Sequence, residues 1–139
     1  MRLVNQGGRL GIEVDGSFID VATRSDRRFS SDPMSAFEVW DDLRDWASTQ
    51  SASERDPKIE FAELGPPVPA PTQVFAIGLH YKDHAEEAGL PLPKSPMVFT
   101  KFPGCGGRPG AQVPLTSDRV EWASEQVVVL RHGENAVPD

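Results

Sequence analysis

The chain has 139 residues and a net charge of −7, with the hydrophobic and charged fractions of a globular protein, so it can build one modest core. The acidic balance disfavours nucleic acids and anionic membrane surfaces as partners, and no apolar run approaches the ~18 residues of a membrane span. Residues 5–8 interrupt any signal-peptide pattern at the N-terminus. We therefore expect a cytoplasmic protein with no nucleic acid or membrane partner.

Residues 1 to about 32 have the pattern of a small antiparallel sheet. The dipeptide "DG" at positions 15 and 16 stands between two alternating runs, which is typical of a two-residue hairpin turn. This turn would place Ile12 opposite Ile19 and Leu10 opposite Val21. Both pairs would lie on one face, so the predicted register is self-consistent.

The stretch "SDPMSAFEVWDDLRDWAST", residues 31–49, predicts a helix. Asp32 can cap its N-terminus, with Pro33 at the first helical position. Apolar residues then recur at helical spacing, with Trp46 at the edge of the stripe. The stripe consists of Met34, Phe37, Trp40, Leu43 and Ala47. A tryptophan-rich stripe can line a ligand site, but we interpret this one as core.

A proline-rich stretch, "GPPVPAP", follows at residues 65–71. Prolines at this density cannot continue a helix or donate to a sheet, so the stretch predicts a stiff, extended connector. We therefore expect a hairpin-and-helix unit at 1–64, a connector at 65–72 and a second part at 73–139.

The second part contains the residues with chemical potential. "QVFAIG" predicts a short buried strand, and "KDHAEEAG" predicts one or two helical turns that Gly89 stops. His84 and Glu87 are then neighbours on one helix face. A carboxylate beside an imidazole raises its basicity and fixes its tautomer, so the imidazole can take a proton from water. The same pair is also common on ordinary exposed helices, and both interpretations stay open at this point.

The single cysteine, Cys105, has no Cys or His at zinc-ligand spacing. We interpret it as a loop residue and not as a nucleophile.

Several motifs occur in a fixed order along the chain: the proline-rich connector, "IGxxYxDHAxE", "PxxFTKFP" and "SDxVxW". In this order they resemble the fumarylacetoacetate hydrolase family, in particular its smaller bacterial members, the fumarylacetoacetate hydrolase domain proteins. The resemblance covers essentially the whole chain and is strongest from Leu64 to Trp122.

The resemblance implies an α+β protein, in which the small N-terminal unit precedes a mixed β-sandwich roll that forms homodimers. It implies a metal-dependent enzyme, with Mg²⁺ or Mn²⁺, acting on a small keto acid. Members hydrolyse a carbon–carbon bond in acylpyruvates or other β-diketo acids, and some are decarboxylases or isomerases. His84 and Glu87 match the pair on a lid helix that activates water, and Lys101 matches a lysine that holds a carboxylate or an oxyanion.

Two departures from the family pattern concern the metal site. The family uses a Glu-x-Glu pair after "SDxVxW"; here Glu125 matches the second glutamate, but Ala123 stands at the first position and cannot ligate. Glu121 is two residues away and would keep the same strand parity. The family pattern also continues well past position 139, which implies a roll that is incomplete, with open strand edges and an uncovered apolar face.

Three hypotheses follow for function. The chain is a hydrolase of this family by origin, or it is a truncated and inactive fragment that binds or dimerises through its exposed strands. The third is an unrelated acidic domain with only local likeness, which the order of the motifs disfavours.

Overall fold

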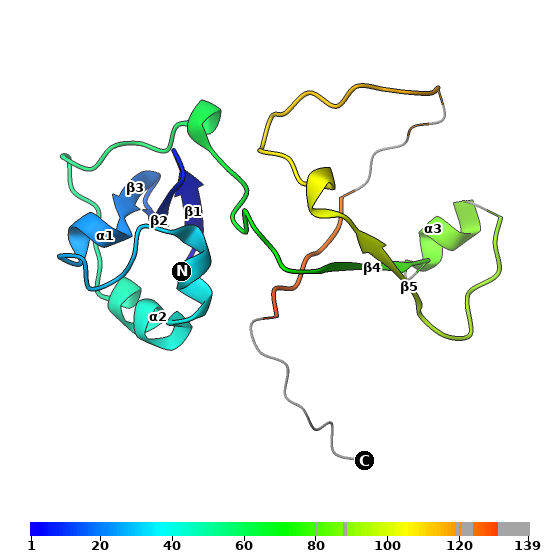
Figure 1. Cartoon of the computed structure of the whole chain (residues 1–139), viewed down its shortest axis with the longest axis horizontal. Helices are drawn as coiled ribbons and strands as arrows, with labels where there is room; N and C mark the ends of the chain where they lie inside the picture. The colour runs from blue at the N-terminus through cyan, green and yellow to red at the C-terminus, as the bar shows by residue number, and fades with distance from the viewer. Residues whose placement is uncertain (80, 88, 119, 121–123, 131–139) are drawn as a thin grey trace, which may run out of the picture. The chain divides into compact units, whose positions relative to one another are not determined.

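The computed structural model describes residues 1–79, 81–87, 89–118, 120 and 124–130 (Figure 1). The chain forms two compact units. The first comprises Met1–Pro67 with the described residues from Arg108 onward, and the second is Val68–Gly107. Within the described residues, no helix is long and apolar enough to cross a membrane.

The first unit contains a three-stranded antiparallel sheet in the order β1-β2-β3. Its strands are β1 (Leu3–Gln6), β2 (Arg9–Val14) and β3 (Ser17–Asp20). Asp15 and Gly16 both have positive φ, at 50° and 74°, as in the type I′ turns that are common in two-residue hairpins, so the predicted turn is present. Ile12 lies opposite Ile19, so the predicted register is confirmed.

The second predicted pair, Leu10 with Val21, is corrected by the structure. Strand β3 ends at Asp20, whose side chain accepts a hydrogen bond from the backbone N–H of Thr23 at 2.8 Å. This cap starts the short helix α1 (Val21–Arg24), so Val21 is helical and does not pair with Leu10 in the sheet. Val21 is fully buried all the same, and Leu10 is 1% exposed.

The predicted single helix over residues 33–49 is two segments in the structure. Asp32 does act as the N-cap and accepts from the N–H of Met34 at 2.9 Å, but the element that follows is a 3₁₀ helix, η1 (Pro33–Phe37). The α-helix α2 (Trp40–Ser48) begins only after Val39, whose backbone is not helical (φ −119°, ψ 31°). Val39 is β-branched, and this residue type loses rotamer freedom in a helix.

The core of the first unit lies between the sheet and these helices. The buried cluster consists of Leu10, Ile12, Ile19, Val21, Phe29, Ala36, Leu43 and Ala47. Trp46 packs against it, with its ring 5.5 Å from that of Phe29. Phe37 and Trp40 instead stack on each other outside the cluster, at 6.2 Å between ring centroids. The core interpretation of the apolar stripe therefore holds for part of it.

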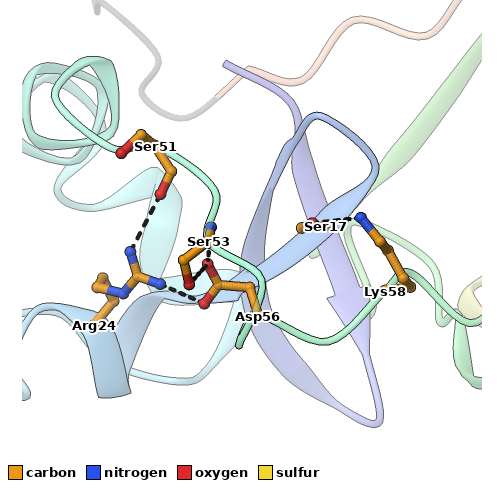
Figure 2. A network of polar contacts seen from close by, with 6 residues as sticks. All are labelled: Ser17, Arg24, Ser51, Ser53, Asp56 and Lys58. Carbon is orange, nitrogen blue, oxygen red and sulfur yellow. Dashed lines mark hydrogen bonds and ion pairs between the residues drawn. The ribbon is translucent and has the colours of Figure 1, made fainter.

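Residues 57–65 pair with both edge strands of this sheet. Lys58 forms an isolated bridge with Ser17 on β3, and Leu64 forms one with Gln6 on β1. The Nζ of Lys58 also donates to the buried hydroxyl of Ser17 at 3.1 Å (Figure 2). The segment, which includes the 3₁₀ helix η2 (Phe61–Glu63), thus covers part of both open edges of the sheet.

The chain that leads into this segment is anchored by Asp56. Its carboxylate binds the guanidinium of Arg24 on α1 and accepts from the N–H and the hydroxyl of Ser53, at 2.7 and 2.9 Å (Figure 2). Arg24 also reaches the carbonyl of Ser51 at 3.4 Å. The hydrogen bond from Arg24 is the largest of the effects that lower the pKa of Asp56.

The second unit is a two-stranded antiparallel sheet with a helix in its connection. Its elements are β4 (Val74–Gly78), α3 (Lys82–Glu87), β5 (Met97–Lys101) and the 3₁₀ helix η3 (Pro103–Cys105). The strand and the helix predicted here are present, but β4 is not buried. Phe75 and Ile77 are 59% and 42% exposed, because the described part of this unit has no further layer on that face.

Small sheets and short helices in both units make this an α+β chain, as predicted. The β-sandwich roll stays a prediction.

Candidate functional site

The helix α3 carries two of the four residues that the sequence singled out. It ends at Glu87, and two hydrogen bonds satisfy its last carbonyl groups: Gly89 N–H to Glu86 at 3.1 Å, and Leu90 N–H to Ala85 at 2.9 Å. Gly89 has φ +63°, which glycine adopts at no steric cost. Gly89 therefore stops the helix, as predicted.

His84 and Glu87 occupy the exposed side of α3. Ala85, between them, is the buried residue of the helix, at 1% exposure. The two side chains are three positions apart and so share a helix face, but no hydrogen bond or ion pair joins them in this conformation. An ion pair on the helix instead joins Lys82 to Glu86, at 3.8 Å. His84 and Glu87 are therefore both accessible to a ligand.

Lys101 is the last residue of β5 and lies opposite Val74. Its Nζ is 5.2 Å from the centroid of the Phe99 ring, a cation–π contact. Phe99 and Met97 lie over Gly78 on β4, where an added Cβ would come within 3.6 Å of Phe99 and 3.1 Å of Met97. Within the described chain Lys101 has no carboxylate partner, so its charge is available to an anion.

Glu125, the residue that matches a metal ligand, belongs to the first unit. It lies in residues 124–130, which have no regular secondary structure. Glu121 and Ala123, which bear on the same ligand set, lie outside the described residues.

The described side chains do not fit a divalent cation. No group of three or more His, Cys, Asp or Glu residues in the described ranges is arranged to hold one. Mg²⁺ needs oxygen ligands in a near-octahedral arrangement, and one glutamate does not supply this.

Cys105 is exposed and has a free thiol at the end of η3.

Comparison with known proteins gives matches over most of the chain and others over a shorter stretch. No protein-family model matches the chain. A fumarylacetoacetate hydrolase domain-containing protein 2 homolog of Dictyostelium discoideum is 33% identical over 131 residues, which are 90% of this chain and 42% of that protein. A Burkholderia cenocepacia protein whose name describes it as a hydrolase is 46% identical over 58 residues, 40% of this chain and 21% of the relative.

One solved structure agrees in fold as well as in sequence. It is a protein of Mycobacterium smegmatis described as an HpcE protein, with a TM-score of 0.72 and 38% identity over 84% of this chain and 41% of that one. The α+β architecture is thus shared over most of the described length.

The chain belongs to the fumarylacetoacetate hydrolase family. It spans about two fifths of the length of the Dictyostelium and Mycobacterium relatives that it matches.

Proposed function

We propose that this chain acts in the hydrolysis of a carbon–carbon bond in an acylpyruvate or another β-diketo acid. The observation that carries the proposal is the exposed His84 and Glu87 at three-residue spacing on α3, in a chain whose relatives include proteins named as hydrolases. An imidazole and a carboxylate on one helix face can activate a water molecule, provided that a bound substrate excludes bulk solvent.

In the proposed reaction, His84 takes a proton from water and Glu87 stabilises the imidazolium that forms. The water oxygen bonds to the carbonyl carbon of the substrate, and the adjacent carbon–carbon bond breaks. Its electron pair stays on the departing carbon as an enolate, and His84 returns the proton to that carbon. Lys101 holds a substrate carboxylate through charge and hydrogen bonds.

The proposal extends to a small keto-acid substrate, a homodimer and a cytoplasmic location. The Mg²⁺ or Mn²⁺ requirement typical of the family is also part of it, with Glu125 as one ligand. The described residues themselves assemble no metal site, so Glu125 would need ligands from elsewhere.

A second candidate is a chain without catalysis that associates through exposed apolar surface. The exposed side chains of β4 and β5 favour it, since Phe75, Val98 and Phe99 are 59%, 59% and 47% exposed. An isomerase or decarboxylase of the same family is a further alternative, which the His84–Glu87 pair disfavours because it is suited to activating water.

The test is an assay of the purified chain with an acylpyruvate, in samples also titrated with Mg²⁺ and Mn²⁺ by calorimetry. Proton transfer by a positioned side chain contributes about 10²–10⁴-fold, so His84→Ala should lower kcat by that factor. Glu87→Gln should lower it less. The matched control is Glu86→Gln, which changes the neighbouring carboxylate that pairs with Lys82 and should leave kcat unchanged.

Turnover that both Glu86→Gln and Glu87→Gln reduce equally would contradict the assigned pair. Absence of both turnover and metal binding would favour the chain without catalysis.

A further inference from the structure

A cleft of about 380 Å³ opens on the first unit, between the start of β2 and the turn that follows α1. This volume is in the range of small-molecule sites. Its polar lining consists of Arg9, Thr23, Arg27, Ser30 and Ser31. Among the described residues that line the cleft, two are arginines and none is acidic, although the chain as a whole carries a charge of −7.

The interior of the cleft includes apolar surface. Phe29 and Ala22 line it and are only 6% and 9% exposed, so they belong to the packed body of the unit. Phe29 is fixed by its contact with Trp46. A ligand in this cleft would therefore meet a rigid aromatic surface beside cationic and hydroxyl groups.

Arg9 is held in place before any ligand arrives. Its Nε and one terminal nitrogen donate to the two carboxylate oxygens of Asp20, at 2.6 and 3.0 Å. The fork geometry leaves the remaining guanidinium N–H groups as donors. Much of the charge of Arg9 is compensated by Asp20, so Arg9 contributes mainly orientation and hydrogen bonds.

Arg27 supplies the uncompensated charge. It is exposed, and no hydrogen bond or ion pair of its side chain occurs within the described chain. Its backbone has φ +64°, directly after Asp26 at φ +51°, a conformation that residues other than glycine rarely adopt. The N–H of Arg27 donates to the carbonyl of Ala22 at 2.8 Å and so fixes the turn. Backbone strain of this kind is concentrated at functional sites.

The hydroxyls add to the donor set. Ser30 Oγ accepts from the N–H of Asp32 at 3.1 Å, which leaves its own O–H as a donor, and Ser31 presents a second hydroxyl. Two guanidinium groups and two hydroxyls offer more donors than the two oxygens of a carboxylate can accept, whereas a phosphate group presents three or four oxygens.

We propose that the cleft formed by Arg9, Arg27, Phe29, Ser30 and Ser31 binds the phosphate group of a small phosphorylated molecule. Arg27 provides the charge, Arg9 and the two serines provide oriented hydrogen bonds, and Phe29 contacts the body of the ligand. The site lies wholly in the first unit and does not depend on the proposed hydrolase reaction.

The experiment is a titration of the purified chain with inorganic phosphate at constant ionic strength, followed by the amide signals of the chain in NMR spectra. Saturable shifts are expected at Arg27, Ser30 and Ser31. Loss of one charge-assisted hydrogen-bonding group costs about tenfold in affinity or more, so Arg27→Gln should weaken binding by at least that factor.

Arg28→Gln is the matched control. Arg28 is the adjacent arginine, its guanidinium lies over the ring of Phe29 at 4.9 Å, and it does not line the cleft. It should weaken phosphate binding clearly less than Arg27→Gln does, since Arg28 does not line the cleft and only a nearby, solvent-screened charge is lost. Equal weakening by Arg27→Gln and Arg28→Gln would overturn the site, because it would indicate attraction by general surface charge. Acetate that binds as tightly as phosphate would overturn the assignment to a phosphate group, and absence of saturable shifts would overturn both.

Discussion

The guanidinium group of Arg9 binds both carboxylate oxygens of Asp20, at 2.6 and 3.0 Å, and so links β2 to the residue where β3 passes into α1. Asp20 also accepts from the N–H of Thr23. The hydrogen bond from Arg9 is the main cause that lowers the pKa of Asp20 to about 2, against the opposing effect of partial burial. One carboxylate therefore serves as an ion-pair partner and as a helix cap.

This pair predicts a loss of stability in acid. The pKa of Asp20 is lower in the folded chain than its ordinary value of 3.8, so its contribution is fully present above pH 4 and is lost as the pH falls toward 2. Because Arg9 is about half exposed, solvent screens the ion pair, and its contribution to the free energy of unfolding is about 1–2 kcal/mol. Asp20→Asn should lower the free energy of unfolding by this amount at pH 7, as measured with urea.

Urea unfolding repeated between pH 2 and pH 4 gives the pH dependence of the free energy of unfolding. This dependence should be shallower for Asp20→Asn than for the original chain. Asp42→Asn, on the exposed face of α2, is the control and should keep the original dependence. Identical slopes for the original chain and Asp20→Asn would show that the ion pair does not contribute.

We expect any side chain at Gly11 on β2 to destabilise the first unit. A Cβ at this position would lie 2.0 Å from the ring of Phe18, which is 6% exposed and cannot easily move. Overpacking of this kind costs about 1–3 kcal/mol, so Gly11→Ala should lower the free energy of unfolding of the first unit by that amount. Adding Phe18→Leu should recover part of the loss, and a double-mutant cycle measures the coupling. Purely additive effects would refute the steric explanation.

Arg27→Gly is expected to stabilise the chain while it weakens phosphate binding. Glycine adopts φ +64° without strain, whereas its greater freedom in the unfolded chain opposes folding. We expect the net effect to raise the free energy of unfolding by about 0.5–1 kcal/mol. Asp26→Gly is the comparison and should gain less, since aspartate tolerates positive φ better than arginine. Thermal unfolding measures both variants. A loss of stability in Arg27→Gly would mean that its side chain stabilises the turn.

The helix α3 is predicted to exchange its amide hydrogens quickly in the absence of ligand. It is only six residues long, and Ala85 is its one buried residue. Short helices gain most of their stability from packing, which is slight here. Hydrogen exchange should show weak protection at the described residues 82–87, and Gly89→Ala, which forces alanine to φ +63°, should weaken it further. Strong protection without ligand would contradict a lid that closes over substrate.

The features predicted correctly from the sequence are those whose conformation is set by residues adjacent in the chain. The turn at Asp15 and the caps at Asp32 and Gly89 need only local chemistry, and all three occur at the expected positions. The helix α1 has four residues, too few to show a helical hydrophobic period in the sequence. The capping residue Asp20 is the only local sequence signal for this helix.

Features that depend on residues distant in the sequence were not predicted. The pairing of Lys58 with Ser17 and of Leu64 with Gln6 uses backbone groups, which leave no periodic pattern. The cleft at Arg9 and Arg27 likewise combines a strand with a turn, and no motif connects them. For the candidate hydrolase site, the local pattern was enough to place His84 and Glu87 on one helix, whereas Lys101 and Glu125 lie on other segments that no local pattern relates to this helix.

The bonds of residues 57–65 to both sheet edges have a consequence for biosynthesis. The carbonyl of Asn5 accepts from the N–H of Gly65, and its side-chain amide donates to the carbonyl of Pro66, each at 2.8 Å. The N-terminus leaves the ribosome first, so the outer edge of β1 stays unpaired until residues 64–66, about sixty positions later, have been synthesised. Until then the three strands pair only among themselves, and the unpaired edge of β1 can bind the strands of other nascent chains. Closure of the β1 edge is therefore timed by the arrival of the proline-rich connector outside the ribosome.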